Sequence, residues 1–323
     1  MELKPVPKRI FLPELERNEP AARDHSTVKN FKICPRKYFY TSIINLRLKL
    51  NSKLAMDFGS CYHKFREVYE YEGETIESAF ETTMELWKEL IGIDPVVGTR
   101  SDHLTKAYLI KACMVGAAYR DAEAAKGRVK VIASEQPVDI YLKDGKTRRG
   151  GLIDQSIMKD GKLTARDFKA SSKTADYWNR MLGPNDQASG YILCLAKLSQ
   201  SPVEQLIFEV LHLSKPTKSK PNNTPTIQQY IVKRSKTQLA RWEDEQIVWE
   251  GMIDQCRDTD FWPMADETYS HCMYCEFRML CDQTFERGII GKIEQYYTQE
   301  IWDYKNMHGE KLKGEEKKGL KDV

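Results

Sequence analysis

The stretch that decides the fold is residues 151–173, GLIDQSIMKDGKLTARDFKASSK, in which two β-prone runs flank Asp160-Gly161. An Asp-Gly pair between alternating apolar residues is the strongest short-range signal for a β-hairpin with a two-residue turn. Counting outward from that turn places Asp154 directly opposite Asp167. Opposed side chains have Cβ atoms about 4.5–5.5 Å apart, and two carboxylates at that separation repel each other.

Apolar neighbours indicate that both faces of this hairpin are at least partly buried. These neighbours are Leu152, Ile153, Ile157, Leu163, Ala165 and Phe168. A buried charge has to be paired or to bind a metal, because leaving it bare is costly. Lys169 lies on the same side of its strand as Asp167 and can neutralise only one of the two aspartates. A divalent cation that bridges both carboxylates would replace repulsion by chelation; the alternative is that one aspartate lies at the surface, screened by solvent.

Composition and length describe a globular chain without a strong overall charge. The 323 residues are 41% hydrophobic and 30% charged, and the formal net charge is +3. This charge is too small to indicate a nucleic-acid partner by itself, so any basic surface has to be local. No segment approaches the roughly 20 apolar residues of a membrane helix, and the first residues do not resemble a signal peptide. Eight cysteines without such a signal argue against a disulfide scaffold.

These features together favour a soluble protein without a membrane partner. We expect it to lie in the cytoplasm of a bacterium or of a phage-infected cell.

Sequence patterns predict helices on both sides of a group of strands. Ser26 is a candidate N-cap for a short helix that ends near Cys34, and Pro35 suits the first position of a helix over 35–46. An aromatic stripe at helical spacing predicts a further helix through Phe58, Tyr62, Phe65 and Tyr69. Strands are predicted over 130–142, 151–158, 163–170, 205–213 and 228–234, and other helices over 75–126, 186–200 and 235–256.

This order of elements is typical of an α/β or α+β domain with a central mixed sheet flanked by helices. The expected segments are an N-terminal arm over 1–25, a helical region over 26–128, the sheet and helix of the core over 129–235, C-terminal helices over 236–308 and a solvated tail over 309–323. Residues 26–308 are expected to form one compact domain.

Two residue pairs outside the hairpin have spacings that suit a site. Gly59 and His63 stand one helical turn apart, so that Gly59 leaves open space beneath the imidazole for a metal or a phosphate. A lone histidine on such an aromatic helix is more often a core residue. The interpretation of His63 as part of a site therefore depends on the other motifs. Gln187 and Tyr191 share a helix face eighteen residues past Lys169, and both can donate hydrogen bonds to phosphate or DNA.

The segment HCMYCEFRMLC places Cys272, Cys275 and Cys281 in a C-x₂-C-x₅-C array. Three cysteines in ten residues indicate a metal site that lacks one ligand, for which zinc is the default metal. The distant Cys34, in FKICPRKYFY, is the candidate fourth ligand, and His271 is the alternative. The other cysteines have unrelated spacings within predicted helices and are expected to be small apolar core residues: Cys61, Cys113, Cys194 and Cys256.

The motif G-x-x-D at 151–154, followed by D-x-K at 167–169, resembles the signature of the PD-(D/E)XK nuclease superfamily. The resemblance implies that the two aspartates and the backbone carbonyl of Phe168 hold Mg²⁺ or Mn²⁺. It also implies that Lys169 positions the attacking water, helps to deprotonate it and stabilises charge on the phosphate. The implied catalytic set is His63, Asp154, Asp167, Lys169, Gln187 and Tyr191.

Several features resemble RecB-type nucleases in particular. Gly59 with His63 is similar to their G-x-x-x-H motif, whose histidine completes the metal shell, and Gln187 with Tyr191 to their Q-x-x-x-Y motif. Glu135 ends the preceding predicted strand, where RecB-type sequences often carry a glutamate, although a surface glutamate is the alternative. The set Cys34, Cys272, Cys275 and Cys281 resembles the ligands of a [4Fe–4S] cluster in AddB-type nuclease domains and in the four-cysteine CRISPR-adaptation nucleases.

This resemblance covers about residues 26–285. It implies a restriction-endonuclease-like core whose N- and C-terminal helices are joined by the four-cysteine cluster. It also implies a metal-dependent DNA exonuclease that acts on single-stranded ends in recombination, repair or CRISPR adaptation. Arg36, Lys37 and Lys173 are candidate DNA contacts. The alternatives are a catalytically silent DNA-binding protein of nuclease fold and a zinc-stabilised interaction protein.

A Walker A sequence is absent from the chain. Any unwinding of duplex DNA would therefore have to come from a partner, such as a helicase or a recombination or adaptation protein.

Overall fold

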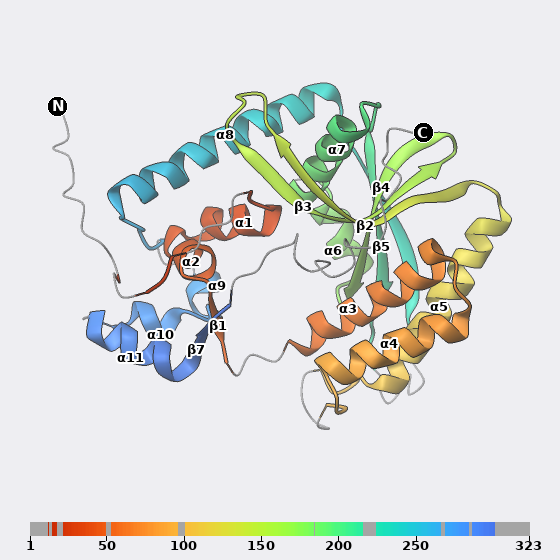
Figure 1. Cartoon of the computed structure of the whole chain (residues 1–323), viewed down its shortest axis with the longest axis horizontal. Helices are drawn as coiled ribbons and strands as arrows, with labels where there is room; N and C mark the ends of the chain where they lie inside the picture. Colours follow the sequence, from red (N-terminus) through yellow and green to blue (C-terminus); the bar gives the residue numbers. More distant parts are fainter. Residues whose placement is uncertain are drawn as a thin grey trace. The chain divides into compact units, whose positions relative to one another are not determined.

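The structure is a computed structural model that describes residues 12, 15–17, 22–49, 53–95, 101–183, 185–215, 224–265, 269–283 and 286–300. The chain divides into two compact units (Figure 1). The first unit draws on the described parts of Met1–Asn51, Asp139–Gly151 and Thr237–Asp322, and the second on those of Ser52–Val138 and Leu152–Lys236. The predicted tail over 309–323 lies outside the described residues, as does part of the predicted arm.

A five-stranded mixed sheet flanked by helices confirms the predicted fold class. Its strands are β2 (Val129–Tyr141), β3 (Arg148–Lys159), β4 (Lys162–Ser171), β5 (Gln205–His212) and β6 (Thr226–Lys233), adjacent in that order. Strands β3 and β4 are antiparallel, β4 and β5 are parallel, and β5 and β6 are antiparallel. The parallel pair needs a long crossover, which the chain makes through two helices.

The hairpin of β3 and β4 has the predicted turn and register. Asp160 and Gly161 have φ values of 49° and 76°, both in the left-handed region that a two-residue type I′ turn requires. The ladder runs from Lys159–Lys162 back to Gln155–Arg166. The next pair along this register would be Asp154 and Asp167, the pair that the sequence predicts.

The helices of the second unit are α3 (Leu54–Arg66), the π-helix η2 (Glu67–Glu72), α4 (Ile76–Leu90), α5 (Lys106–Ala125), α6 (Ala175–Met181) and α7 (Asp186–Ser199). Side chains of α3, η2, α4 and α5 form an aromatic core. The predicted stripe is confirmed for Phe58, Tyr62 and Phe65, which are buried in one cluster with residues of α4 and α5. Its fourth member, Tyr69, lies in η2 and packs partly buried against that cluster. Gly116 permits the close approach of α5, because a Cβ there would lie 3.0 Å from the Tyr62 hydroxyl.

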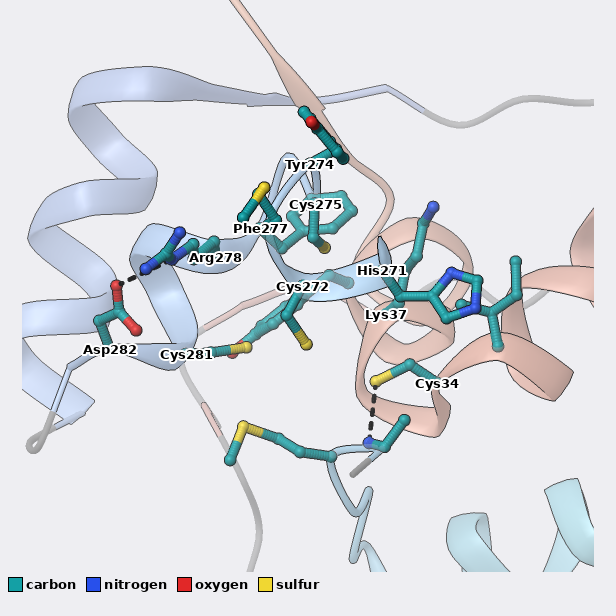
Figure 2. Close-up of a pocket in the computed structure, with 15 residues that line it drawn as sticks. Cys34, Lys37, His271, Cys272, Tyr274, Cys275, Phe277, Arg278, Cys281 and Asp282 are labelled. Carbon is teal, nitrogen blue, oxygen red and sulfur yellow. Dashed lines mark hydrogen bonds and ion pairs between the residues drawn. The ribbon is translucent and has the colours of Figure 1, made fainter. Parts of the chain in front are cut away.

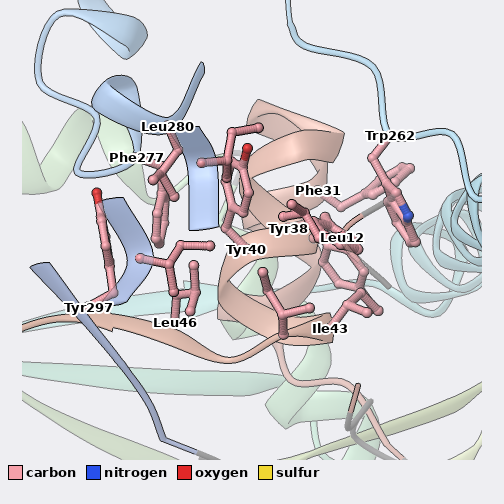
Figure 3. Packing of buried hydrophobic residues seen from close by; sticks show 14 of the residues in the cluster. Leu12, Phe31, Tyr38, Tyr40, Ile43, Leu46, Trp262, Phe277, Leu280 and Tyr297 are labelled. Atoms are coloured by element: carbon pink, nitrogen blue, oxygen red, sulfur yellow. The ribbon is translucent and has the colours of Figure 1, made fainter. Parts of the chain in front are cut away.

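The first unit joins segments from both ends of the chain. Its elements are α1 (His25–Ile33), α2 (Pro35–Tyr38), the π-helix η1 (Phe39–Ile43), β1 (Leu46–Leu48), α8 (Lys236–Thr259), α9 (Tyr269–Cys272), α10 (Arg278–Cys281), α11 (Glu286–Tyr296) and β7 (Tyr297–Gln299). Strands β1 and β7 pair antiparallel. A cluster of buried apolar side chains, including Tyr38, Tyr40, Trp262 and Phe277, holds these segments together (Figure 3).

Two local predictions about the first helices are wrong. Asp24, and not Ser26, caps α1, because Oδ1 of Asp24 accepts a hydrogen bond of 2.7 Å from the backbone N–H of Thr27. The helix that begins at Pro35 ends at Tyr38 and continues as a π-helix, so it is shorter than the predicted span over 35–46. Residue spacing alone does not reveal the extra residue that a π-turn inserts.

The described part of the predicted N-terminal arm lies against the first unit's own core. Leu12 is fully buried, and Nη1 of Arg17 lies 2.7 Å from Oδ1 of Asp260. Among the described residues, no helix is both long enough and apolar enough to cross a membrane.

Candidate active site

The D-x-K segment on β4 presents its acid and its lysine on one face and its aromatic residue on the other. Asp167 is buried, and its Oδ2 atom lies 2.7 Å from Nζ of Lys169. Its Oδ1 atom accepts a hydrogen bond of 2.7 Å from Nε2 of Gln187 on α7. The ring of Phe168 lies 6.5 Å from that of Tyr62 on α3. The alternation of the strand therefore separates the polar pair from its apolar support.

Asp154 on β3 connects the hairpin to α3. Its Oδ2 atom accepts a hydrogen bond of 2.7 Å from the backbone N–H of Phe168 and lies 3.6 Å from Nδ1 of His63. A Cβ added at Gly59, one turn before the imidazole, would meet no atom within 4 Å. The space that the sequence predicts beside this turn of α3 is therefore open.

Glu135 joins His63 and Asp154 at this place, although the sequence left its role open. Each of the three residues offers one ligand atom, and these atoms lie within 4.8 Å of one another. No other group of three histidine, cysteine or acidic residues is gathered so closely in the part of the chain that the structure describes. Glu135 has a φ of 47° within β2, a left-handed conformation that is strained for a non-glycine residue. Such a conformation in a strand is typical of a bulge that redirects a side chain.

Burial sets the charge balance of these residues. Removal from water raises the pKa of Asp154 to about 7, while Lys169 opposes the shift and Glu135 adds to it. It raises the pKa of Asp167 to about 6, again against the effect of Lys169. Burial also lowers the pKa of His63, with Glu135 acting in the opposite sense. Burial by itself would lower the pKa of Lys169, but the two aspartates raise it, so the ammonium stays charged.

The donor set fits a hard divalent cation. Carboxylate oxygens and one imidazole nitrogen are ligands that Mg²⁺ and Mn²⁺ accept. The raised pKa values of Asp154 and Asp167 mean that ionised carboxylates are unfavourable here until a cation accompanies them. The group of three ligand atoms within 4.8 Å of one another includes Glu135 and does not include Asp167. The carboxylate of Asp167 contacts Lys169 and Gln187 instead.

Behind Phe168 lies a buried charge network of two arginines and two glutamates. Arg66 on α3 pairs with Glu70 on η2, and its Nη1 atom lies 2.6 Å from Oε1 of Glu209 on β5. Arg166 on β4 lies 2.5 Å from Oε2 of Glu70 and 3.5 Å from Oε2 of Glu209. The guanidinium carbons of Arg66 and Arg166 lie 4.3 Å and 5.1 Å from the centre of the Phe168 ring. The network therefore supports the residue whose backbone N–H donates a hydrogen bond to the carboxylate of Asp154.

The structure brings together most of the catalytic set that the sequence predicts. The residues joined by the contacts above are His63, Asp154, Asp167, Lys169 and Gln187. Tyr191 is buried one turn further along α7. Lys173, a predicted DNA contact, follows β4, and its Nζ atom lies 5.3 Å from the centre of the Tyr177 ring on α6. The predicted metal contact of the Phe168 carbonyl stays a prediction.

The four predicted cluster cysteines line one cavity of about 660 Å³ in the first unit. Cys34 precedes α2, Cys272 ends α9, Cys275 lies in the following turn and Cys281 ends α10. Figure 2 shows the sulfur atoms of Cys34, Cys272 and Cys281 directed toward a shared space. His271, the alternative ligand, is exposed at the same cavity.

Two of these sulfurs have backbone donors, and basic residues lie close by. The Sγ atom of Cys34 accepts a hydrogen bond of 3.4 Å from the backbone N–H of Ala265. Burial raises the pKa of Cys275, although a backbone hydrogen bond from Phe277 and the charge of Lys37 both lower it. Burial likewise raises the pKa of Cys281 to about 11, with Arg36 opposing the shift. Two of the three basic residues predicted to contact DNA, Arg36 and Lys37, therefore lie beside the cysteines.

The other four cysteines behave as the sequence predicts. Cys61, Cys113 and Cys194 are buried, and Cys256 is half-buried against the apolar cluster of the first unit.

The family model of the PD-(D/E)XK nuclease superfamily matches residues 25–282. Because this match covers most of the chain and includes both the hairpin acids and the D-x-K lysine, the protein belongs to the PD-(D/E)XK nuclease superfamily. No curated protein matches the chain.

Two solved structures resemble the chain at low identity. A candidate exonuclease from Eubacterium rectale is 14% identical, with 82% of this chain and 89% of that chain covered and a TM-score of 0.48. The protein SSO0001 is also 14% identical, with 72% and 86% covered and a TM-score of 0.26. Likenesses of this size carry no argument about function.

Proposed function

We propose that this protein is a metal-dependent deoxyribonuclease that hydrolyses phosphodiester bonds at single-stranded DNA ends. The observation that carries the proposal is the meeting of His63, Glu135 and Asp154 within 4.8 Å, next to the Asp167–Lys169 pair. Membership of the nuclease superfamily supports the reaction class. The preference for single-stranded ends rests on the resemblance to RecB-type nucleases.

His63, Glu135 and Asp154 would hold the divalent cation, with Asp167 as the predicted further ligand. A bound cation supplies charge neutralisation at the phosphate and a nucleophilic water at neutral pH. Nζ of Lys169, one third exposed, would orient that water and donate a hydrogen bond to the phosphate oxygen on which negative charge develops. Gln187 holds Asp167 in place through its amide N–H.

The four cysteines of the first unit would hold a [4Fe–4S] cluster. The four cysteines line one cavity, and thiolates are the usual ligands of such clusters. The cluster would join α2 to α9 and α10 and so stabilise the first unit.

Recombination, repair and CRISPR adaptation are the settings in which we place this activity. A partner helicase would supply unwinding, because the sequence carries no Walker A motif.

Digestion of end-labelled DNA tests the proposed reaction. The full chain, purified without oxygen, is incubated with single- or double-stranded oligonucleotide and either Mn²⁺, Mg²⁺ or a chelator. We expect shortening of the single-stranded substrate with either metal and none with the chelator. Intact single-stranded DNA under every metal condition would refute a nuclease and favour a DNA-binding protein. Cleavage of duplex interiors with intact ends would refute the preference for ends.

Binding of Mn²⁺ is expected to weaken as the pH falls from about 8 to about 5.5. The pKa of Asp154 is raised to about 7 and that of Asp167 to about 6, so both carboxylates take up protons across this range. Because a cation binds the ionised form, proton competition should lower the apparent affinity by roughly tenfold or more at the lower pH. The lowered pKa of His63 keeps the imidazole neutral over most of the range.

Isothermal titration calorimetry with MnCl₂ at the two pH values measures this effect. Asp154→Asn is the control, since it removes the group with the highest carboxyl pKa and should flatten the pH dependence of any residual binding. Equal affinities for the unsubstituted protein at both pH values would show that these carboxylates do not bind the metal.

A further inference from the structure

The hydroxyl group of Tyr40 is buried without a hydrogen-bond partner. Tyr40 lies in η1, its side chain is fully buried, and its ring centre is 5.3 Å from that of Phe277 (Figure 3). Its oxygen has no hydrogen-bond partner among the described residues. A buried hydroxyl is nearly always paired, because leaving it unpaired is costly. An orphaned hydroxyl at a fixed position therefore calls for a partner that the protein chain does not supply.

Tyr40 lines the cavity of the four cysteines. Burial raises its pKa, and Cys281 is the side chain that adds most to that shift, ahead of Tyr297 and Cys34. Cys34 and Cys275 already have backbone N–H donors. The orphaned hydroxyl and the four cysteines thus lie at the same cavity.

We propose that the Tyr40 hydroxyl donates a hydrogen bond to a sulfur atom of the metal group that the cysteines hold, at or beside Cys281. The inference rests on the proposed iron–sulfur cluster and makes Tyr40 a positioning residue for it. Hydrogen-bond donors beside a metal group orient its ligands and tune its reduction potential. An O–H···S hydrogen bond draws negative charge from sulfur and favours the reduced cluster, so Tyr40 should raise the reduction potential.

Tyr40→Phe tests the proposal because it removes only the oxygen and keeps the buried ring. The full chain is purified without oxygen, and iron, sulfide, the visible spectrum and the midpoint potential are measured. We expect the variant to retain iron, to have a more negative midpoint potential and to release iron to a chelator several-fold faster. In iron-free protein the variant should be at least as stable as the unsubstituted chain, because the orphaned hydroxyl is gone.

Tyr38→Phe is the matched control. Tyr38 is equally buried two residues earlier, but its hydroxyl accepts a hydrogen bond of 2.7 Å from Nε of Arg23. We therefore expect that variant to lose stability and to keep its midpoint potential. Cys275→Ser, which removes a predicted ligand, should lose iron.

Two outcomes overturn the inference in distinguishable ways. An iron-containing protein whose potential and iron release are unchanged by Tyr40→Phe refutes the role of Tyr40 alone. An unsubstituted protein that is colourless, or that holds zinc, refutes the cluster and the inference with it.

Discussion

Asp154→Asn is expected to abolish DNA cleavage, lowering the rate by at least about 10³-fold, and to leave the folded protein at least as stable at pH 8. The amide oxygen can still accept the hydrogen bond from the backbone N–H of Phe168, so the hairpin keeps its geometry. The amide has no charge, however, and cannot replace a carboxylate beside His63 and Glu135 in binding a cation.

The stability half of this prediction follows from the raised pKa of Asp154. A carboxyl whose folded-state pKa is about 7 takes up a proton more readily when folded than when unfolded. The metal-free protein therefore loses stability as the pH rises through that value, and it regains stability when the charge is removed. Asp154→Asn should raise the free energy of unfolding of the metal-free protein at pH 8 by about 1 kcal/mol or more.

Asp160→Asn in the same hairpin is the matched control. Residue 160 has a φ of 49° in the turn, a position at which asparagine is as favourable as aspartate. Initial rates on a labelled single-stranded oligonucleotide with Mn²⁺, together with urea unfolding in a chelator, measure both effects. Cleavage by Asp154→Asn at the rate of the unsubstituted protein would rule out the proposed site. A loss of stability would show that the charge of Asp154 does not destabilise the metal-free protein.

Local sequence signals predicted the hairpin that carries this site, because the turn itself fixes the register. Asp160-Gly161 satisfies the two left-handed positions of a type I′ turn, and the opposition of Asp154 and Asp167 follows by counting. The aromatic stripe of α3 was predictable for the same kind of reason, since its period is local.

Glu135 could be singled out only by resemblance. A strand pattern assigns alternate residues to alternate faces, and the left-handed conformation of Glu135 breaks that assignment. No local signal in the surrounding sequence marks the position as a bulge. Its place beside His63 therefore becomes visible only in the structure.

The buried charge network could not be predicted from the sequence. Its members Arg66, Glu70, Arg166 and Glu209 come from a helix, a π-helix and two strands. Charged residues are almost never fully buried unless they are paired, and pairing over such sequence separations leaves no periodic pattern. Arg166 and Glu209 lie in strands in which the adjacent residues are also buried. Only their ion pairs with the other members of the network explain why charged side chains are tolerated there.

Glu209→Gln is expected to destabilise the protein by roughly 3–5 kcal/mol, the cost of removing one partner from a buried ion pair. Glu209 is almost completely buried, and its carboxylate lies 2.6 Å from Arg66 and 3.5 Å from Arg166. Burial alone would raise the pKa of Glu209, but the two arginines hold it below its usual value, so the charge is present in the folded state. After the substitution, Glu70 remains as the one acid between two buried guanidinium groups.

A double-mutant cycle with Arg66→Met separates charge balance from packing. Each single variant leaves an unbalanced buried charge, whereas the double variant pairs Arg166 with Glu70 and restores neutrality. The double variant should therefore be more stable than the sum of the single losses predicts, with a coupling of about 1–3 kcal/mol. Urea unfolding measured by circular dichroism gives the three values. Glu245→Gln, which removes an exposed acid paired with Arg241 within α8, should change stability by no more than about 0.5 kcal/mol.

The Glu209→Gln variant also tests whether the charge network positions the metal site. Phe168 lies against the guanidinium groups of Arg66 and Arg166, and its backbone N–H binds Asp154. If the network fixes the position of Phe168, Glu209→Gln should weaken Mn²⁺ binding at temperatures at which the variant is still folded. The double variant with Arg66→Met should recover part of the lost Mn²⁺ affinity. Unchanged Mn²⁺ affinity in a destabilised but folded Glu209→Gln protein would show that the network stabilises the sheet without positioning the site. That result would contradict the link through Phe168 and leave the metal ligands themselves unaffected.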